Sequence, residues 1–127
     1  MPTSGVVFVV DDDPSMLKGI ERLLRTHGFD AQVFCSVEEF HCRANLREAV
    51  CLVLDIRLDG KSGIELRREI AIAGVSIPVV FITADDSDTT RKAAIEAGCV
   101  AYLTKPFTAK SLIEGIARAS DNPRQTE

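Results

Sequence analysis

Apolar residues gather in short continuous runs along the chain, and several of these runs end at a polar side chain. Runs of this length, rich in β-branched and aromatic residues, are typical of strands buried on both faces of a parallel sheet. A weaker pattern follows the first run and predicts one more strand. We therefore expect five strands, over about residues 6–10, 30–34, 51–55, 79–83 and 100–104.

Segments with helical spacing separate the predicted strands. Asp13 is placed to cap a first helix, with Pro14 at its first position and Gly28 just beyond its end. Ser36 and Glu39 form an S-x-x-E pattern that predicts the start of a second helix. Because strands alternate with helices, the sequence predicts an α/β fold with a doubly wound parallel sheet. Three further helices are expected over about residues 64–73, 90–97 and 109–119.

The length of 127 residues is sufficient for one domain with a single core. We assign residues 1–120 to this domain and expect residues 121–127 to be a disordered tail or the start of an interdomain linker, since they are polar and contain Pro123. No apolar run approaches the roughly 20 residues that span a bilayer, and no secretory signal pattern opens the chain. We therefore expect a cytoplasmic protein with no membrane contact.

Two classes of function are disfavoured by the composition. The four cysteines are irregularly spaced without a C-x-x-C pair, and His27 and His41 do not complete a zinc-binding pattern. The net charge of −4 argues against direct nucleic-acid binding, which needs a basic surface to displace counterions. Contact with DNA would then belong to another domain or to a partner.

Chemically useful side chains follow four of the predicted strands. Asp11 and Asp12 follow the first, Asp55 ends the third, Thr83 ends the fourth and Lys105 follows the fifth. These strand ends meet at one edge of a parallel sheet, where such folds bind ligands. Two carboxylates about 4 Å apart repel by roughly 4 kcal/mol at an effective dielectric near 20, so a proton or a metal ion is needed there. Carboxylate oxygens without histidine or cysteine favour Mg²⁺.

The same groups suit phosphoryl transfer, which needs a nucleophile, a cation and donors to the phosphoryl oxygens. Asp55 is the best placed nucleophile, because it ends what should be the central strand. In sequence the groups lie within V-D-D, L-V-L-D, F-I-T-A and K-P-F. Their order and spacing resemble those of the receiver domains of two-component response regulators, over about residues 6–119.

This resemblance implies a flavodoxin-like (βα)5 fold with strand order 2-1-3-4-5. It implies that Asp55 accepts a phosphoryl group from a sensor histidine kinase. It also implies a Mg²⁺ site made by Asp12 directly, Asp11 mainly through water, Asp55, and the backbone carbonyl of Arg57. Thr83 and Lys105 would then hold the phosphoryl oxygens.

The resemblance further implies a switch that changes a protein-binding surface. Tyr102 occupies the position of an aromatic side chain that turns inward when Thr83 moves toward the phosphate. The surface would be formed by the fourth helix, the fifth strand and the fifth helix. It would control an effector domain or a downstream protein, with transcription as the expected output and homodimerisation on phosphorylation as an option. The peptide bond between Lys105 and Pro106 is expected to be cis.

The chain departs from the family pattern in the segment after Asp55. Asp59 stands where the family usually has proline, so we expect the loop over residues 57–62 to be less rigid, whereas Leu58 for the common methionine changes little. Arg57 and Asp85 flank the predicted phosphate site and carry opposite charges. We hypothesise that they form an ion pair that hinders water and lengthens the lifetime of the phosphoryl group.

The leading interpretation is a signalling switch, not an enzyme, that catalyses its own phosphorylation and slow dephosphorylation. Two alternatives remain beside it. One is a phosphatase of the haloacid dehalogenase type, because Asp11 and Asp13 form a D-x-D pattern with Thr83 and Lys105 further along. Such a phosphatase needs acidic metal ligands after the lysine, where this sequence offers few. The other alternative is a pseudo-receiver that binds partners without being phosphorylated.

Overall fold

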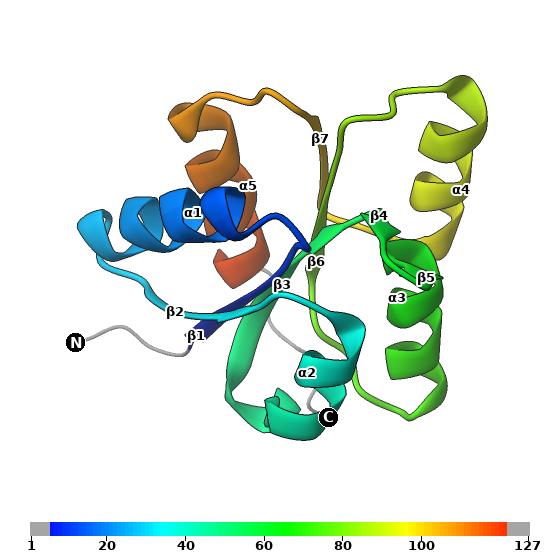
Figure 1. The fold of residues 1–127 in the computed structure, drawn as a ribbon, viewed down its shortest axis with the longest axis horizontal. Helices are drawn as coiled ribbons and strands as arrows, with labels where there is room; N and C mark the ends of the chain where they lie inside the picture. Colours follow the sequence, from blue (N-terminus) through cyan, green and yellow to red (C-terminus); the bar gives the residue numbers. More distant parts are fainter. Residues whose placement is uncertain (1–5, 122–127) are drawn as a thin grey trace.

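The computed structural model describes residues 6–121. Its main feature is a five-stranded parallel sheet with the order β2-β1-β3-β6-β7 (Figure 1). This order is the predicted 2-1-3-4-5. Two short strands between β3 and β6 take the labels β4 and β5, so β6 and β7 are the fourth and fifth strands of the prediction. The sheet strands are β1 (Val6–Val10), β2 (Asp30–Phe34), β3 (Ala49–Asp55), β6 (Val79–Thr83) and β7 (Ala101–Thr104).

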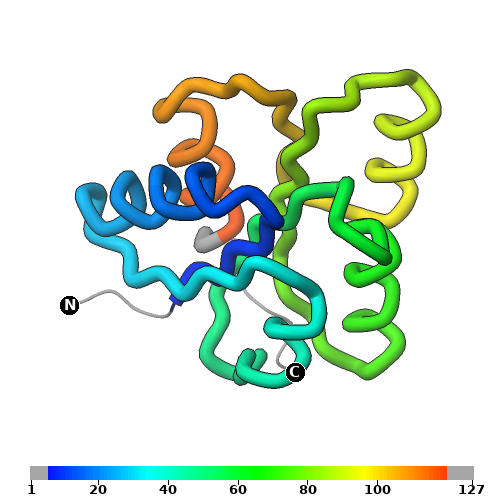
Figure 2. The backbone as a smooth tube through the Cα atoms, in the orientation of Figure 1, coloured from blue at the N-terminus to red at the C-terminus, as the bar shows by residue number. Residues whose placement is uncertain are grey.

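Helices cover both faces of the sheet, as a doubly wound fold requires (Figures 1 and 2). One face packs against α1 and α5 through apolar residues such as Leu24, Leu112 and Ile116. The other packs against α2, α3 and α4 through residues such as Phe40 and Leu66. The helices are α1 (Pro14–Thr26), α2 (Val37–Arg43), α3 (Gly63–Ile72), α4 (Asp88–Ala97) and α5 (Ala109–Asp121), with a 3₁₀ turn η1 (Leu46–Glu48) before β3.

The central strand β3 lies between β1 and β6, and its residues from Cys51 to Asp55 are all buried. Its continuous apolar sequence suits this place, since both of its faces are covered by helices. The β3 strand therefore carries Asp55 at the centre of the sheet edge, as the sequence predicted.

Helix caps explain where several helices begin. The Asp13 carboxylate accepts hydrogen bonds from the backbone N–H groups of Ser15 and Met16, at 3.0 and 3.4 Å, which confirms it as the cap of α1. Ser36 caps α2 by accepting from the Glu39 N–H, but the Glu39 carboxylate binds the N–H of Cys35 and not that of Ser36. The pattern seen in the sequence thus forms only half of a capping box.

The segment after Asp55 differs from the predicted loop. Strands β4 (Arg57–Leu58) and β5 (Lys61–Ser62) pair antiparallel as a small hairpin, and Gly60 lies in its turn with φ of 85°. A complete capping box between Ser62 and Glu65 then begins α3. The segment that contains Asp59 thus has regular structure, with the hairpin before the helix cap.

Smaller differences concern the chain beyond β6. Strand β7 begins at Ala101, one residue later than predicted, and the Lys105–Pro106 peptide is cis as expected. Helix α5 includes Asp121, which the sequence placed in the tail, while residues 122–127 lie outside the described residues. Within residues 6–121, none of the helices has the length and apolar character that crossing a bilayer would require.

Candidate functional site

The predicted site residues of four strand ends come together at one edge of the sheet. Asp11 follows β1 with an exposure of 0%, and Asp55 ends β3 with an exposure of 4%. The Lys105 ammonium, just after β7, donates hydrogen bonds to the Oδ2 atoms of both, at 2.9 and 2.8 Å. These contacts join residues 94 and 50 positions apart in the sequence, so the fold alone brings the groups together.

Three carboxylates form a compact cluster that suits a hard divalent cation. Asp11, Asp12 and Asp55 each offer an oxygen within 4.8 Å of the others, and Asp12 is the exposed member. The remaining oxygens of the buried pair are oriented by backbone N–H groups, since Asp13 N donates to Asp11 Oδ1 and Arg57 N donates to Asp55 Oδ1. A set of three carboxylates open to solvent on one side matches the oxygen ligands and retained waters that Mg²⁺ prefers.

The charges in the site are unusual because they are buried together. Burial raises the pKa of Asp55 and the Asp11 charge adds to this, against the lowering effect of hydrogen bonds from Lys105 and the Arg57 N–H. Burial works against the charged form of Lys105, yet its hydrogen bonds to Asp55 and Asp11 outweigh burial and raise its pKa. The Lys105 ammonium therefore offsets the carboxylate repulsion, which the sequence analysis had left to a proton or a metal ion.

Thr83 is buried at the end of β6, beside the cluster in the sheet order. Its hydroxyl accepts a hydrogen bond from the backbone N–H of Asp85 at 2.9 Å and donates to the Asp85 carbonyl at 3.3 Å. The hydroxyl is therefore held by the loop that leads to α4. Any movement of Thr83 must change the hydrogen bonding of this loop.

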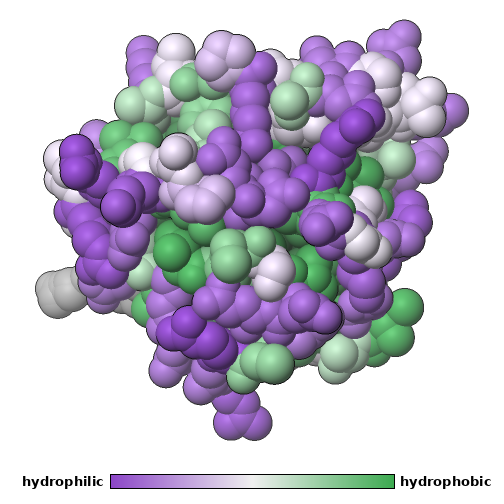
Figure 3. Space-filling model, viewed as in Figure 1, coloured by the Kyte–Doolittle hydropathy of each residue, from purple (hydrophilic) through white to green (hydrophobic). Residues whose placement is uncertain are grey.

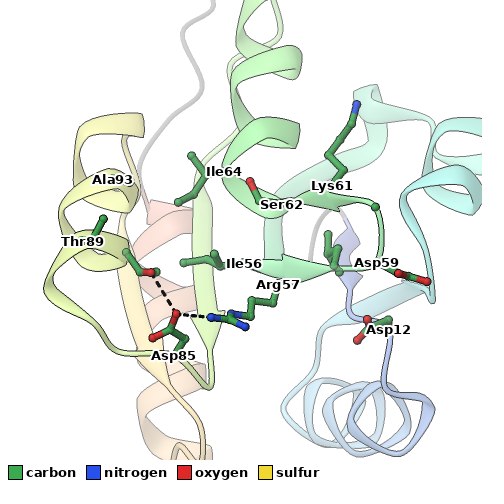
Figure 4. Close-up of a pocket in the computed structure, with 13 residues that line it drawn as sticks. Asp12, Ile56, Arg57, Asp59, Lys61, Ser62, Ile64, Asp85, Thr89 and Ala93 are labelled. Atoms are coloured by element: carbon green, nitrogen blue, oxygen red, sulfur yellow. Dashed lines mark hydrogen bonds and ion pairs between the residues drawn. The ribbon is translucent and has the colours of Figure 1, made fainter.

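The ion pair expected between Arg57 and Asp85 is present in the structure. An Arg57 Nη2 donates to Asp85 Oδ2 at 2.7 Å, and Figure 4 shows the guanidinium reaching from the hairpin to the loop before α4. This hydrogen bond holds the pKa of the Asp85 carboxyl below its usual range. Ser87 N and the Thr90 hydroxyl also donate to the Asp85 carboxylate, so the pair links β4 to the start of α4.

A cavity of about 690 Å³ lies beside the carboxylate cluster, between the β4–β5 hairpin and α4. Its apolar lining includes Ile56, Leu58, Ile64 and Ala93. Charged side chains line it as well, among them Asp12 and Asp59, which are labelled in Figure 4. On the face drawn in Figure 3, apolar residues are visible in hollows between hydrophilic ones. The sequence offered no sign of this cavity, because its lining comes from four separate segments.

Tyr102, the predicted switch residue, lies half-buried in β7. The register of β6 and β7 pairs it with Phe81, so the side chains of Thr83 and Tyr102 are on the same face of the sheet. The Tyr102 hydroxyl donates to Asp86 at 3.4 Å, and the Arg91 guanidinium lies 4.7 Å from the ring centroid. Sequence reasoning missed Asp86 and Arg91, since no local pattern connects them with a residue of β7.

Comparisons with known proteins agree with this architecture. The chain is 34% identical to Nodulation protein W of Bradyrhizobium diazoefficiens, over 97% of the chain and 54% of that protein. It is also 34% identical to the transcriptional regulatory protein FixJ of Rhizobium meliloti, over 94% of the chain and 59% of that protein. The crystal structure of FixJ-N superposes with a TM-score of 0.88 at 31% identity, covering 98% of this chain and all of that one. The chain thus spans little more than half the length of these two curated relatives.

The family model of the response regulator receiver domain matches residues 7–117. This range contains the carboxylate cluster, Lys105 and the five strands of the sheet except Val6, the first residue of β1. The match separates the chain from the dehalogenase-type phosphatases considered above. With its fold, its strand order and its acidic edge, the chain belongs to the response regulator receiver domains, the phosphoacceptor signalling modules of two-component systems.

Proposed function

We propose that this chain receives a phosphoryl group on Asp55 from the phosphohistidine of a sensor histidine kinase, in a reaction that depends on Mg²⁺. The observation that carries the proposal is the buried Asp55 carboxylate, which lies next to Asp11 and Asp12 and is hydrogen-bonded to Lys105. A buried carboxylate with both acidic and cationic neighbours is costly for stability and is poorly explained by packing. It is well explained as a nucleophile.

In the proposed transfer, a carboxylate oxygen of Asp55 attacks the phosphorus in line with the departing histidine nitrogen. A P–O bond forms as the P–N bond breaks, and the histidine leaves with its electron pair and takes up a proton. Asp11, Asp12, Asp55 and the Arg57 carbonyl would hold Mg²⁺, which supplies positive charge to the phosphoryl oxygens. Lys105 already touches Asp55, so its ammonium is placed to bind one of these oxygens.

The proposed output is a change at the surface formed by α4, β7 and α5. Thr83 would move from the Asp85 backbone to the phosphoryl group, and Tyr102 would follow on the same face of the sheet. The phosphoryl group drives such a change only if it binds the active arrangement more tightly. The name of FixJ supports transcription as the output, through an effector domain or partner joined beyond residues 1–120. We place the protein in the cytoplasm, with homodimerisation as one way in which the surface could act.

The test is treatment with acetyl phosphate and Mg²⁺ followed by mass spectrometry. We expect the intact protein to gain the mass of one phosphoryl group, and peptide mapping to locate it on Asp55. Chelation of Mg²⁺ and the Asp55→Asn variant should each abolish the gain. Labelling at another residue, or equal labelling of the variant, would overturn the proposal. If the parent is never labelled, and the parent and Asp55→Asn bind the same partner equally well, the chain is a pseudo-receiver.

Replacing Arg57 with alanine should shorten the lifetime of the phosphoryl group. The Arg57–Asp85 pair joins β4, which begins two residues after Asp55, to the start of α4, and we expect its loss to open a path for hydrolytic water to Asp55. Because the arginine is 71% exposed, we expect only about a few-fold faster dephosphorylation. The rate is measured by following loss of the label after acetyl phosphate is removed. The exposed Arg68→Ala serves as the control, and an unchanged or slower rate in Arg57→Ala would contradict the expectation.

A further inference from the structure

Helix α4 is held to the rest of the domain with little apolar packing. Of its ten residues, only Ala94 is buried, and Ala93 and Ala97 pack half-buried against the core. Three alanine methyl groups contribute little hydrophobic stabilisation, so polar contacts at the start of the helix carry more weight than usual. The Asp85 carboxylate accepts hydrogen bonds from Ser87 N and the Thr90 hydroxyl there. A second group of contacts joins Asp86, Arg91 and Tyr102.

Asp86, Arg91 and Tyr102 form a closed set of three contacts. The Asp86 Oδ1 atom accepts from Arg91 Nη2 at 2.9 Å and from the Tyr102 hydroxyl at 3.4 Å. The Arg91 guanidinium also lies over the Tyr102 ring, at 4.7 Å from its centroid, within the range of cation–π attraction. The three residues come from the loop after β6, from α4 and from β7. Each contact is modest alone, but together they fix the ring and its hydroxyl at the surface.

The loop that carries Asp86 also holds the Thr83 hydroxyl. Asp85, the neighbour of Asp86, binds Thr83 through both its N–H and its carbonyl. A movement of Thr83 toward Asp55 would leave the Asp85 N–H without this partner and disturb the loop next to Asp86. The structure thus offers a direct route from the sheet edge to the three contacts around Tyr102.

We propose that Asp86 and Arg91 are positioning residues that clamp the Tyr102 ring at the surface of the unphosphorylated protein. The inference rests on the switching role of Tyr102 in the proposed function. Phosphorylation of Asp55 must then break the clamp before the ring turns inward. Removing the clamp raises the population of the active arrangement, and a ligand that binds this arrangement binds more tightly by the same factor.

The sequence makes a direct measurement available, because Tyr102 is the only tyrosine and there is no tryptophan. Intrinsic fluorescence of the whole chain therefore reports on this ring alone. We would titrate the protein with beryllium fluoride in the presence of Mg²⁺, which mimics a phosphoryl group on a carboxylate, and follow tyrosine emission. For Arg91→Ala we expect an apparent Kd about two- to fivefold lower than that of the parent, in keeping with a small cluster of exposed contacts.

Three variants make the test specific. Lys92→Ala removes the same charge from the next position of α4, which is also exposed, and should leave the Kd unchanged. Arg91→Lys keeps a cation near Asp86, so its Kd should be closer to that of the parent than to that of Arg91→Ala. Adding Asp86→Asn to Arg91→Ala should lower the Kd little further, because both changes break the same clamp.

Equal Kd values for Arg91→Ala and Lys92→Ala, or weaker binding by Arg91→Ala, would overturn the clamp. Labelling with acetyl phosphate separates this failure from a failure of the proposed function. If Asp55 is labelled while the Arg91 variants behave like Lys92→Ala, only the clamp is wrong. If the parent neither takes up a phosphoryl group nor changes its emission, the proposed function and the clamp fall together.

Discussion

Replacing Lys105 with methionine is expected to lower the free energy of unfolding of the metal-free protein by about 3 kcal/mol. Its ammonium is the cation that contacts both Asp11 and Asp55, and methionine keeps most of the apolar stem while removing the charge. The value is at the low end for breaking a buried ion pair, because the lysine side chain is 17% exposed and Asp55 can take up a proton. Urea unfolding in the presence of a chelator measures the loss.

The loss should grow as the pH rises. Since the folded pKa of Asp55 is raised above its ordinary value, its contribution to stability is complete at low pH and is lost as the pH rises through the folded pKa. Without Lys105, which lowers that pKa, the loss extends to higher pH. The difference between variant and parent should therefore be larger at pH 8 than at pH 5.

Mg²⁺ should reverse part of this loss. At about a hundredfold excess over its dissociation constant, Mg²⁺ should stabilise the parent by about 2.7 kcal/mol. The variant should gain more at the same concentration, because no ammonium competes for the carboxylates. Lys110→Met, an exposed change of the same charge on α5, should alter stability by less than about 0.5 kcal/mol. Equal losses for the two variants would show that Lys105 does not stabilise the acidic cluster.

Replacing Gly63 with alanine is expected to cost about 1–3 kcal/mol of stability or more, and to disturb the site as well. A Cβ at this position would lie 2.4 Å from the backbone carbonyl oxygen of Asp55 and 3.1 Å from its carbon. Backbone atoms cannot yield as a flexible side chain can, so α3 must move away from β3. Because a displacement of about 1 Å at a reacting group can cost about 10²-fold in rate, labelling of Asp55 should slow markedly.

Gly19→Ala is a control that should change stability in the opposite direction. Gly19 is exposed inside α1, and a Cβ added there would meet no atom of the described residues within 4 Å. Alanine should stabilise the helix by about 0.5–1 kcal/mol and leave labelling unchanged. Thermal unfolding measures the stability of both variants. A Gly63→Ala protein as stable and as quickly labelled as the parent would contradict the close approach of Gly63 to the Asp55 backbone.

The site was predictable where its residues follow strong local patterns. Asp55 and Thr83 end continuous apolar runs, and parallel strands bring such ends to one edge, so their convergence follows from the sequence. The contact of Lys105 with both acids was not predicted, since it depends on three-dimensional register between residues up to 94 positions apart. The sequence analysis consequently assigned charge compensation to a proton or a metal ion, and it expected Lys105 at this edge only as a partner of the phosphoryl oxygens.

Local structure was missed where elements are short or polar. The β4–β5 hairpin has two residues per strand, too few for an alternating pattern to appear. The complete capping box of α3 at Ser62 and Glu65 follows the same S-x-x-E pattern that was assigned to Ser36 and Glu39. Whether such a pattern forms both hydrogen bonds of a capping box depends on the direction from which the chain enters the helix. That direction is a property of the fold.

The long separation between Asp11 and Lys105 has a consequence during synthesis. A nascent chain exposes the acidic residues early, but the lysine that neutralises them is made about 94 residues after the first of them. Until that segment has left the ribosome and β7 has joined the sheet, the carboxylates lack this counter-charge. If Asp55 accepts a phosphoryl group as proposed, we expect an incomplete translation product without Lys105 to be a poor acceptor.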